Sequence, residues 1–246
     1  MSLHFQQSLR HRLEDGLKQM GLSVSSHQLD QFGMFFELLL EWNQKMNLTT
    51  ITDPEKVVTH HFLDSASCAL SPGYDQAMEL LDVGTGAGFP GVPLKILFPG
   101  QAYTLMDSLR KRITFLHRVT ETLELEKTRL IHRRAEDGGR DPQHRETYDA
   151  VVSRAVAGLP VLLEYAIPFV KVGGRFFCQK GPQWEEELKE GQYAMKRLSV
   201  ELEESLRVRI PFTELQHQLL VFRKTAATPS QYPRKPGTPG KKPLQR

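Results

Sequence analysis

The stretch Leu81-Asp-Val-Gly-Thr-Gly-Ala-Gly88 places three glycines in five residues directly after an apolar run. That run, Met78–Val83, predicts a buried strand that ends where the glycines begin. Gly84, Gly86 and Gly88 permit positive φ angles and carry no Cβ, so the backbone can approach a ligand closely. Open α/β sheets bind ligands at the carboxyl ends of their strands. The stretch therefore predicts an α/β fold with a ligand-binding loop.

Downstream of this loop, strand and helix patterns alternate along the chain. The predicted strands span 102–106, 128–132, 148–153 and 174–179, and the predicted helices span 92–98, 108–123 (with Ser108 as N-cap), 159–170 and 184–197. Two further predicted strands, 206–211 and 218–223, are joined by a short turn. This order predicts right-handed βαβ units in a three-layer, Rossmann-like domain. Its sheet is expected to be mostly parallel, with a C-terminal antiparallel hairpin.

The residues before the loop have helical spacing instead. Apolar residues recur every three or four positions in 3–20 and again in 27–46, where Ser26 is the expected N-cap. Asp53 and Pro54 predict the start of a third helix that runs to about Cys68. We expect residues 1–71 to form a helical extension packed on a catalytic domain that spans 72–224.

Composition places the chain among soluble globular proteins, with 39% hydrophobic and 25% charged residues. No apolar run reaches the roughly 18 to 20 residues of a membrane helix, and the N-terminus lacks a signal-peptide core. We therefore predict a cytoplasmic protein that is not bound to a membrane. Cys68 and Cys178 are too few for a disulfide framework and lack the spacing of a zinc site, so no metal is predicted.

The last 22 residues differ in charge from the remainder. Residues 225–246 hold five basic and no acidic residues, which leaves 27 basic against 29 acidic residues elsewhere. A basic tail on a near-neutral body is consistent with an RNA partner. The alternative is a solvated tail without a partner. The Pro-, Gly- and Lys-rich composition predicts that this tail is disordered.

The main alternative for the glycine loop is a dinucleotide site. Gly86-Ala-Gly-Phe-Pro-Gly91 matches the spacing GxGxxG, and Asp107 lies at about the right distance for a ribose contact. However, the first glycine of that fingerprint should end the strand, and this position belongs to Gly84. Counted from Gly84, the third glycine is replaced by Phe89. The register therefore favours an S-adenosylmethionine loop over an NAD(P)- or FAD-dependent oxidoreductase.

Two further positions suit an adenosyl group. Asp107 ends the second predicted strand, where its carboxylate is available to ribose hydroxyls, although it could instead only begin the next helix. Ala135 and Glu136 follow the third strand, where backbone amides and a carboxylate can bind the edge of adenine. The alternative for Glu136 is a solvated loop residue.

The fourth predicted strand ends in Val151-Val-Ser-Arg-Ala155, at the edge where such folds transfer the methyl group. The Asn/Asp-Pro-Pro-aromatic turn that holds an exocyclic amine is absent, and neither cysteine has the context of a pyrimidine nucleophile. Guanine N7 already has a lone pair, so alignment of N7, methyl carbon and sulfur is the main requirement. We name Arg154, suited to guanine O6, and Lys180, suited to phosphate, as candidate catalytic residues. The alternatives are a structural ion pair for Arg154 and an exposed surface lysine for Lys180.

Several of these motifs resemble those of one known family. The motifs are Asn47-Leu-Thr-Thr-Ile51, His60-His-Phe-Leu-Asp-Ser65, Leu81–Leu94, Asp107-Ser108 with Lys111-Arg112, Ser153-Arg-Ala155 and Lys180-Gly181. Over residues 10–224 the chain resembles the bacterial ribosomal RNA small subunit methyltransferase G family, formerly called glucose-inhibited division protein B. The resemblance implies a class I methyltransferase fold. It also implies S-adenosylmethionine-dependent methylation of guanine N7 in the decoding region of 16S ribosomal RNA.

The resemblance also implies roles for individual residues. The cofactor positions of the family fall on Gly84, Phe89, Ala135, Glu136 and Arg154. Asn47, His60 and His61 are candidates for the RNA-facing side, with core packing as the alternative for both histidines. The expected partner is 16S ribosomal RNA or the small ribosomal subunit, and we expect a monomer. A non-catalytic RNA- or ribosome-binding protein that keeps the fold stays an alternative, and the family implies no role for the tail.

Overall fold

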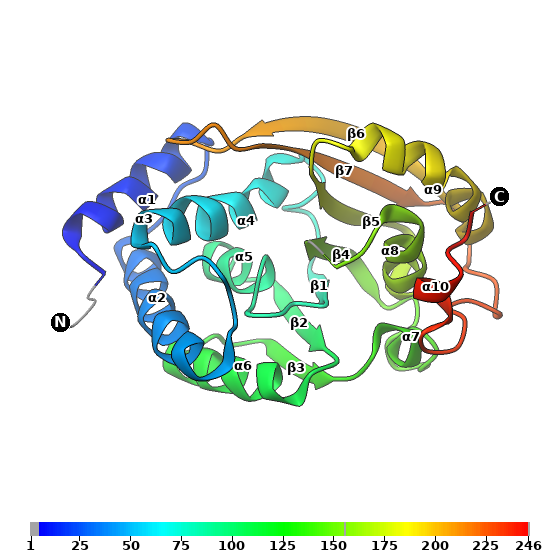
Figure 1. The fold of residues 1–246 in the computed structure, drawn as a ribbon, viewed down its shortest axis with the longest axis horizontal. Helices are drawn as coiled ribbons and strands as arrows, with labels where there is room; N and C mark the ends of the chain where they lie inside the picture. The colour runs from blue at the N-terminus through cyan, green and yellow to red at the C-terminus, as the bar shows by residue number, and fades with distance from the viewer. Residues whose placement is uncertain (1–4, 155, 246) are drawn as a thin grey trace.

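The computed structural model describes residues 5–154 and 156–245, so that the first two positions of the predicted helical range 3–20, and Ala155, lie outside the described residues. Its centre is a seven-stranded sheet in the order β3-β2-β1-β4-β5-β7-β6 (Figure 1). The strands are β1 (Glu79–Val83), β2 (Ala102–Asp107), β3 (Thr128–His132), β4 (Tyr148–Arg154), β5 (Val170–Lys180), β6 (Val200–Arg209) and β7 (Gln216–Lys224).

The first five strands are parallel, whereas β7 pairs antiparallel with β5 and with β6. This arrangement confirms the predicted fold class. The strand order reverses between β1 and β4, where Leu80 pairs with Ala150 and Asp82 with Val152. The glycine loop after β1 and Arg154 at the end of β4 therefore meet at one edge of the sheet, the place where open α/β sheets bind ligands.

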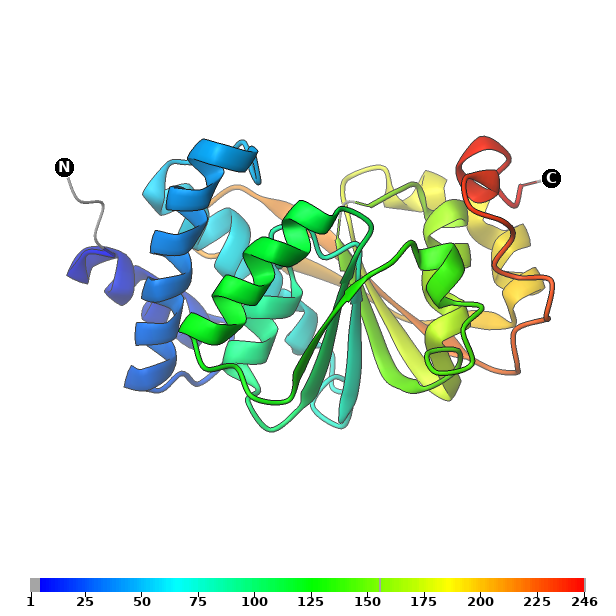
Figure 2. The same cartoon turned by 90° about the horizontal axis from the view of Figure 1, so that it is seen from below.

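Helices cover both faces of the sheet (Figures 1 and 2). One face carries α1 (Gln7–Gln19), α2 (Ser26–Met46), α5 (Gly91–Leu97) and α6 (Arg110–Thr122); the other carries α7 (Ala135–Gly138), α8 (Leu159–Ala166), α9 (Trp184–Leu198) and α10 (Thr238–Lys241). Successive strand residues serve the two faces in turn, since Leu80 lies in one apolar core and Leu81 in the other.

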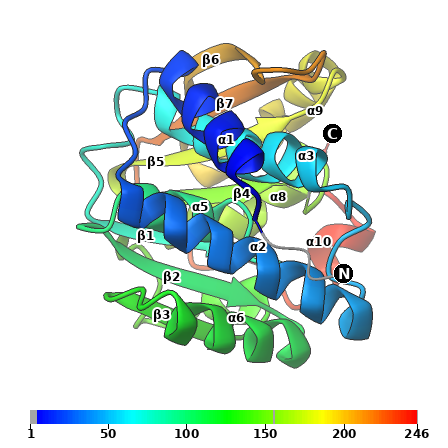
Figure 3. The same ribbon diagram turned by 90° about the vertical axis from the view of Figure 1, so that its left-hand side faces the viewer.

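The N-terminal helices share a core with the sheet and form no separate one. Figure 3 shows α2 lying along the α5–α6 side of the sheet. Gln28 Nε2 donates to the Ile96 carbonyl (2.7 Å) and Gln31 Nε2 to the Leu123 carbonyl (2.7 Å). The N-cap of α2 is Ser25 and not the expected Ser26, because a capping box needs the residue three positions before Gln28.

The helix predicted for 54–68 is instead four short segments. They are α3 (Pro54–Lys56), a π-helix (Val57–Leu63), α4 (Asp64–Ala66) and a 3₁₀-helix (Ser67–Leu70). Asp53 is its N-cap, as expected, and accepts from the Lys56 amide (2.9 Å). The π-helix widens the turn that carries His60 and His61 toward the end of β4. Such turns are frequent at functional sites.

The C-terminal segment, residues 225–245, packs against the domain, contrary to the predicted disorder. Arg145 donates to the carbonyls of Thr228 (2.6 Å) and Tyr232 (2.8 Å), and Tyr232 and Leu244 join the core on the α8–α9 side. Composition did not show this because Arg145 lies 83 and 87 residues before the two carbonyls that it binds. Within the described part of the chain, no helix is long and apolar enough to cross a membrane.

Candidate active site

The glycine loop has the backbone that its sequence predicts. Gly84, Gly86 and Gly88 have φ angles of +72°, +61° and +94°. A Cβ on Gly84 would lie 2.8 Å from Val156 Cγ2, and one on Gly88 would lie 2.6 Å from Val92 Cγ2. Glycine is therefore required at position 84 because a side chain would collide with Val156, and at position 88 because it would collide with Val92 of α5.

Asp107 holds the start of the next helix, as its alternative interpretation expected, and it also binds the glycine loop. Its Oδ2 accepts from the Gly86 amide (3.0 Å) and from Arg112 Nη1 (3.1 Å), and its Oδ1 accepts from the Leu109 amide (2.8 Å). The carboxylate thus fixes both the glycine loop and the start of α6, and the predicted N-cap Ser108 does not cap this helix. A carboxylate has about four acceptor sites, so one stays free for a ligand hydroxyl.

A cavity of about 380 Å³, here called the loop cavity, opens beside these residues. Four predicted cofactor residues line it: Gly84, Asp107, Ala135 and Glu136. Sequence reasoning did not name as cofactor residues several others that also line it: Arg112, Arg133, Arg134, Val156 and Tyr165. Arg133 and Arg134 directly follow β3, a position that could have marked them, whereas no sequence pattern brings Tyr165 of α8 to this place.

Glu136 is buried at the start of α7, with 3% of its surface exposed. Its Oε1 accepts a hydrogen bond from the Gly237 amide (2.9 Å). Burial raises the pKa of the neighbouring Tyr165, and the charges of Glu136 and Glu164 raise it further. The predicted carboxylate is therefore present in the cavity, beside a neutral phenol, and is not the solvated loop residue of the alternative interpretation.

Four other predicted cofactor residues do not line the loop cavity: Gly86, Gly88, Phe89 and Arg154. Phe89 packs elsewhere. Its ring stacks on His61, with centroids 4.4 Å apart and an interplanar angle of 15°. The Arg154 guanidinium lies 5.0 Å from the centroid of the same ring. Phe89 thus joins the glycine loop to the π-helix through an aromatic contact and a cation–π contact.

Arg154 forms the ion pair that was its alternative interpretation. Its Nη1 donates to Asp64 Oδ2 (2.6 Å) and to the His60 carbonyl (3.2 Å), and its Nη2 donates to His61 Nδ1 (3.2 Å). Since arginine only donates, His61 Nδ1 accepts, and its Nε2 proton is assigned to the bond with Thr49 Oγ1 (2.8 Å). These bonds engage three of the five guanidinium N–H groups.

Asp64 is the centre of this polar cluster. Its Oδ1 lies 2.9 Å from His217 Nδ1 on β7. Burial alone would raise the pKa of Asp64, but the His217 hydrogen bond and the Arg154 charge outweigh burial and lower it. The carboxyl is therefore ionised beside Arg154. Asp64 belongs to the motif His60–Ser65, whereas no sequence pattern marks His217, which reaches the cluster through the hairpin.

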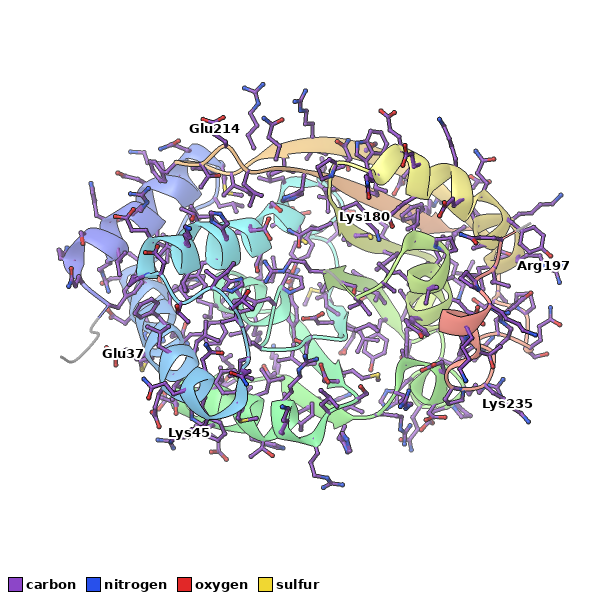
Figure 4. All side chains as sticks on the ribbon, viewed as in Figure 1. Glu37, Lys45, Lys180, Arg197, Glu214 and Lys235 are labelled. Carbon is purple, nitrogen blue, oxygen red and sulfur yellow. The ribbon has the colours of Figure 1, made fainter. Side chains whose placement is uncertain are left out.

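A larger groove of about 1100 Å³, here called the hairpin groove, lies on the other side of Val156. Arg154, Asp64, Gln179 and His217 line it, and so do Lys180 of β5 and Glu214 of the β6–β7 turn, both labelled in Figure 4. Trp184 and Glu187 of α9 also line it. The groove therefore holds both candidate catalytic residues at the sheet edge.

Lys180 is buried rather than on the open surface. Its Nζ donates to the Ala157 carbonyl (2.8 Å) and to Glu187 Oε2 (2.7 Å), and 7% of its surface is exposed. Asn47 is exposed at the end of α2 and lines neither cavity, and the half-buried His60 contacts the site through its backbone carbonyl. His61 is buried against Phe89, as its alternative interpretation expected.

Two buried groups of the site titrate with opposite effects on stability. Burial and the Arg154 charge lower the pKa of His61 to about 3, so the unfolded chain binds a proton below about pH 6.5 that the folded chain does not. Burial raises the pKa of Asp82 to about 7, so the folded chain keeps a proton between about pH 7 and pH 4 that the unfolded chain releases. Acidification thus weakens folding through His61 and favours it through Asp82.

We expect H61Q and D82N to change the pH dependence of stability in opposite directions. Between pH 7 and pH 5, the free energy of unfolding should rise by about 2 kcal/mol for H61Q and fall by about 2 kcal/mol for D82N, each relative to wild type. Urea denaturation at pH 5, 6 and 7 measures both. Three parallel pH profiles would contradict the assigned protonation states.

Both cysteines, Cys68 and Cys178, are buried and unpaired, and burial raises the pKa of Cys178 to about 12. Neither thiol is thus a ready nucleophile. Among residues 5–154 and 156–245, no group of three or more His, Cys, Asp or Glu side chains is placed to hold a metal ion.

Comparison with known proteins now places the chain in a family. Residues 28–215 match the family described as rRNA small subunit methyltransferase G. The ribosomal RNA small subunit methyltransferase G of Alkaliphilus metalliredigens is 50% identical over 233 residues, which cover 95% of this chain and 98% of that protein. The protein of the same name from Alkaliphilus oremlandii is 49% identical over 237 residues, or 96% and 99%.

The chain belongs to the rRNA small subunit methyltransferase G family. This membership confirms the resemblance and the predicted enzyme class, an rRNA methyltransferase, and it argues against the oxidoreductase alternative. The alignment with the A. oremlandii relative leaves at most nine of the 246 residues of this chain outside it. The 22-residue segment 225–246 is therefore at least partly shared with that member of the family.

Solved structures show the same fold at low identity. The fibrillarin pre-rRNA processing protein of Methanococcus jannaschii is 14% identical, with a TM-score of 0.53 over 66% of this chain and 75% of that one. M. jannaschii TYW2, solved in complex with AdoMet, is also 14% identical, with a TM-score of 0.51 over 65% and 74%. These likenesses concern the fold alone.

Proposed function

We propose that this chain transfers a methyl group from S-adenosylmethionine to N7 of a guanine in the decoding region of 16S ribosomal RNA. The observation that carries the proposal is that the loop cavity and the hairpin groove share Val156, at the edge where β1 and β4 end. One cavity suits a cofactor and the other suits an acceptor base, so the methyl group would pass beside this side chain. The printed family name supports ribosomal RNA as the substrate.

The residues of the loop cavity fit S-adenosylmethionine. The buried carboxylates of Asp107 and Glu136 suit ribose hydroxyls and the adenine amine, and Gly84 leaves the space that a Cβ would fill. Ala135 would supply backbone contacts to the adenine. When bound, the cofactor supplies an electrophilic methyl carbon on a positively charged sulfur. Phe89 packs against His61 and Arg154, and we propose that it positions the glycine loop.

The hairpin groove fits a guanine that acts through its own lone pair. No base is needed for attack by N7, so the task of the chain is orientation. The bonds of Arg154 to Asp64, His60 and His61 use three of its five guanidinium N–H groups. The other two can donate to guanine O6. Positive charge develops on the guanine during the transfer, and the ionised Asp64 nearby favours that charge.

Lys180 has a different proposed role from the phosphate contact expected from sequence. Lys180 Nζ donates to the carbonyl of Ala157, which follows β4, and to Glu187 Oε2 of α9. Glu187 Oε2 also accepts from the Leu159 amide (2.8 Å) at the start of α8. The lysine therefore holds these three segments together. We propose Lys180 as a positioning residue of the groove wall. One chain supplies all the residues named for the two cavities, which supports a monomer. A ribosomal substrate would place the reaction in the cytoplasm.

We expect 16S ribosomal RNA from cells without the gene to lack one N7-methylguanine that is present when the gene is supplied. Borohydride reduction and aniline cleavage, followed by primer extension across the decoding region, map this nucleotide. A gene copy with Gly84→Asp is the matched control and should fail to restore it. An unchanged methylation pattern with retained cofactor binding would instead support the non-catalytic RNA-binding alternative.

A further inference from the structure

The C-terminal segment is anchored on a fully buried carboxylate behind the loop cavity. Glu164 of α8 has 0% of its surface exposed. Its Oε1 accepts from the Arg234 amide (2.7 Å) and from Arg234 Nε (2.9 Å), and its Oε2 accepts from Arg234 Nη2 (2.6 Å). Charge-assisted bonds of this kind are the strong ones, and a buried carboxylate requires them.

The same arginine closes the segment into a loop. Arg234 Nη2 also donates to the Lys242 carbonyl (2.8 Å), so one side chain holds both ends of residues 234–242. These residues, here called the clasp, include α10, and Lys235 lies at the edge of the molecule beside it (Figure 4). Arg140, two residues after α7, donates from Nε to the carbonyl of Pro233 (2.7 Å), the residue directly before the clasp.

The clasp donates a hydrogen bond to a residue that lines the loop cavity. The Gly237 amide, in a residue with φ of +80°, donates to Glu136 Oε1 (2.9 Å). Glu136 is buried and lines the cavity, and its carboxylate keeps further acceptor sites. A donor fixed by the clasp therefore sets the orientation of a carboxylate that the cavity presents to its ligand.

We propose that the clasp is part of the cofactor site and that Gly237 and Arg234 act as positioning residues that hold Glu136 for the adenine. This inference rests on the proposed function, since it takes S-adenosylmethionine as the ligand of the loop cavity. Docking of the clasp and binding of the ligand affect each other reciprocally. If the docked clasp strengthens ligand binding through Glu136, the bound ligand must stabilise the docked clasp by the same free energy.

The first test measures this reciprocity in the unaltered protein. We expect saturating S-adenosylhomocysteine to slow amide hydrogen exchange in residues 234–242 by at least about fivefold, while the hairpin turn at 210–215 exchanges at an unchanged rate. Equal exchange rates in the clasp with and without the ligand would overturn the inference. That result is expected if the clasp only packs on the fold and does not affect the cofactor site.

The second test removes the anchor without leaving a buried charge. The double variant R234Q/E164Q keeps an amide pair. As a control, R175Q/E203Q removes a more exposed Arg–Glu ion pair on the sheet (2.6 Å) away from both cavities. We expect the first to raise the Kd for S-adenosylhomocysteine and the KM for S-adenosylmethionine about tenfold with kcat within about twofold, and the second to change neither.

The outcomes separate the two proposals. Wild-type affinity in R234Q/E164Q together with ligand-independent exchange would reject the clasp and leave the proposed function standing. If wild-type protein fails to bind S-adenosylhomocysteine, both proposals fail together. Should R234Q/E164Q not fold, the exchange experiment on wild type still decides the matter, because it needs no variant.

Discussion

Gly84→Asp should weaken binding of S-adenosylhomocysteine by on the order of 100-fold or more while the chain stays folded. A Cβ at this position would lie 2.8 Å from Val156 Cγ2, and the new carboxylate would join Asp107 and Glu136 in the loop cavity. Like charges in one partly buried site repel, and the side chain also fills the space that the ligand needs. Isothermal titration calorimetry measures the affinity.

Gly21→Asp is the matched control for this change. Gly21 also has a positive φ, +77°, but nothing lies within 4 Å of its ideal Cβ position. Aspartate tolerates left-handed backbone better than most residues, so Gly21→Asp should lose little stability. Gly84→Asp should lose more, because its side chain also meets Val156 and adds a charge beside Asp107 and Glu136. Affinity is expected to fall only in Gly84→Asp. Full affinity in that variant would show that the loop cavity is not the cofactor site.

Arg154→Met should reduce methylation of the small ribosomal subunit by about 100-fold or more and also destabilise the protein by about 3 kcal/mol. The loss of stability follows because Asp64 is buried with 11% of its side chain exposed and would lose its ion-pair partner. The loss of activity follows from the guanidinium that the hairpin groove would lack. Methyl transfer from labelled cofactor to unmodified subunits measures one effect, and urea denaturation the other.

A second variant separates these two effects. Arg154→Met combined with Asp64→Asn removes both charges, so most of the lost stability should return while activity stays low. The amide oxygen of the introduced asparagine can still accept from His217, which keeps the rest of the cluster. Activity that recovers together with stability would mean that Arg154 acts only through the fold.

The sequence was sufficient for the sheet and for the glycine loop because both depend on local patterns. Short apolar runs that alternate with helical patterns predict β1 to β5. The positive φ at Gly84 favours a residue without Cβ. Asp107 and Glu136 follow from the same logic, since parallel strands end at one edge.

The missed features depend on contacts between distant segments. Phe89 turns away from the loop cavity because His61 and Arg154, which are 28 residues before it and 65 after it, stack on its ring. The C-terminal segment is ordered because Glu164 lies buried at a position that only the packing of α8 determines. No window of sequence contains such pairs.

Val156 has a consequence for the size of the group that can be transferred. It lies between the two cavities, and its Cγ2 occupies the space that any side chain at position 84 would need. A group that moves from one cavity to the other beside this residue would meet a branched aliphatic side chain. We therefore expect Val156 to limit the transfer of alkyl groups longer than methyl from synthetic sulfonium donors.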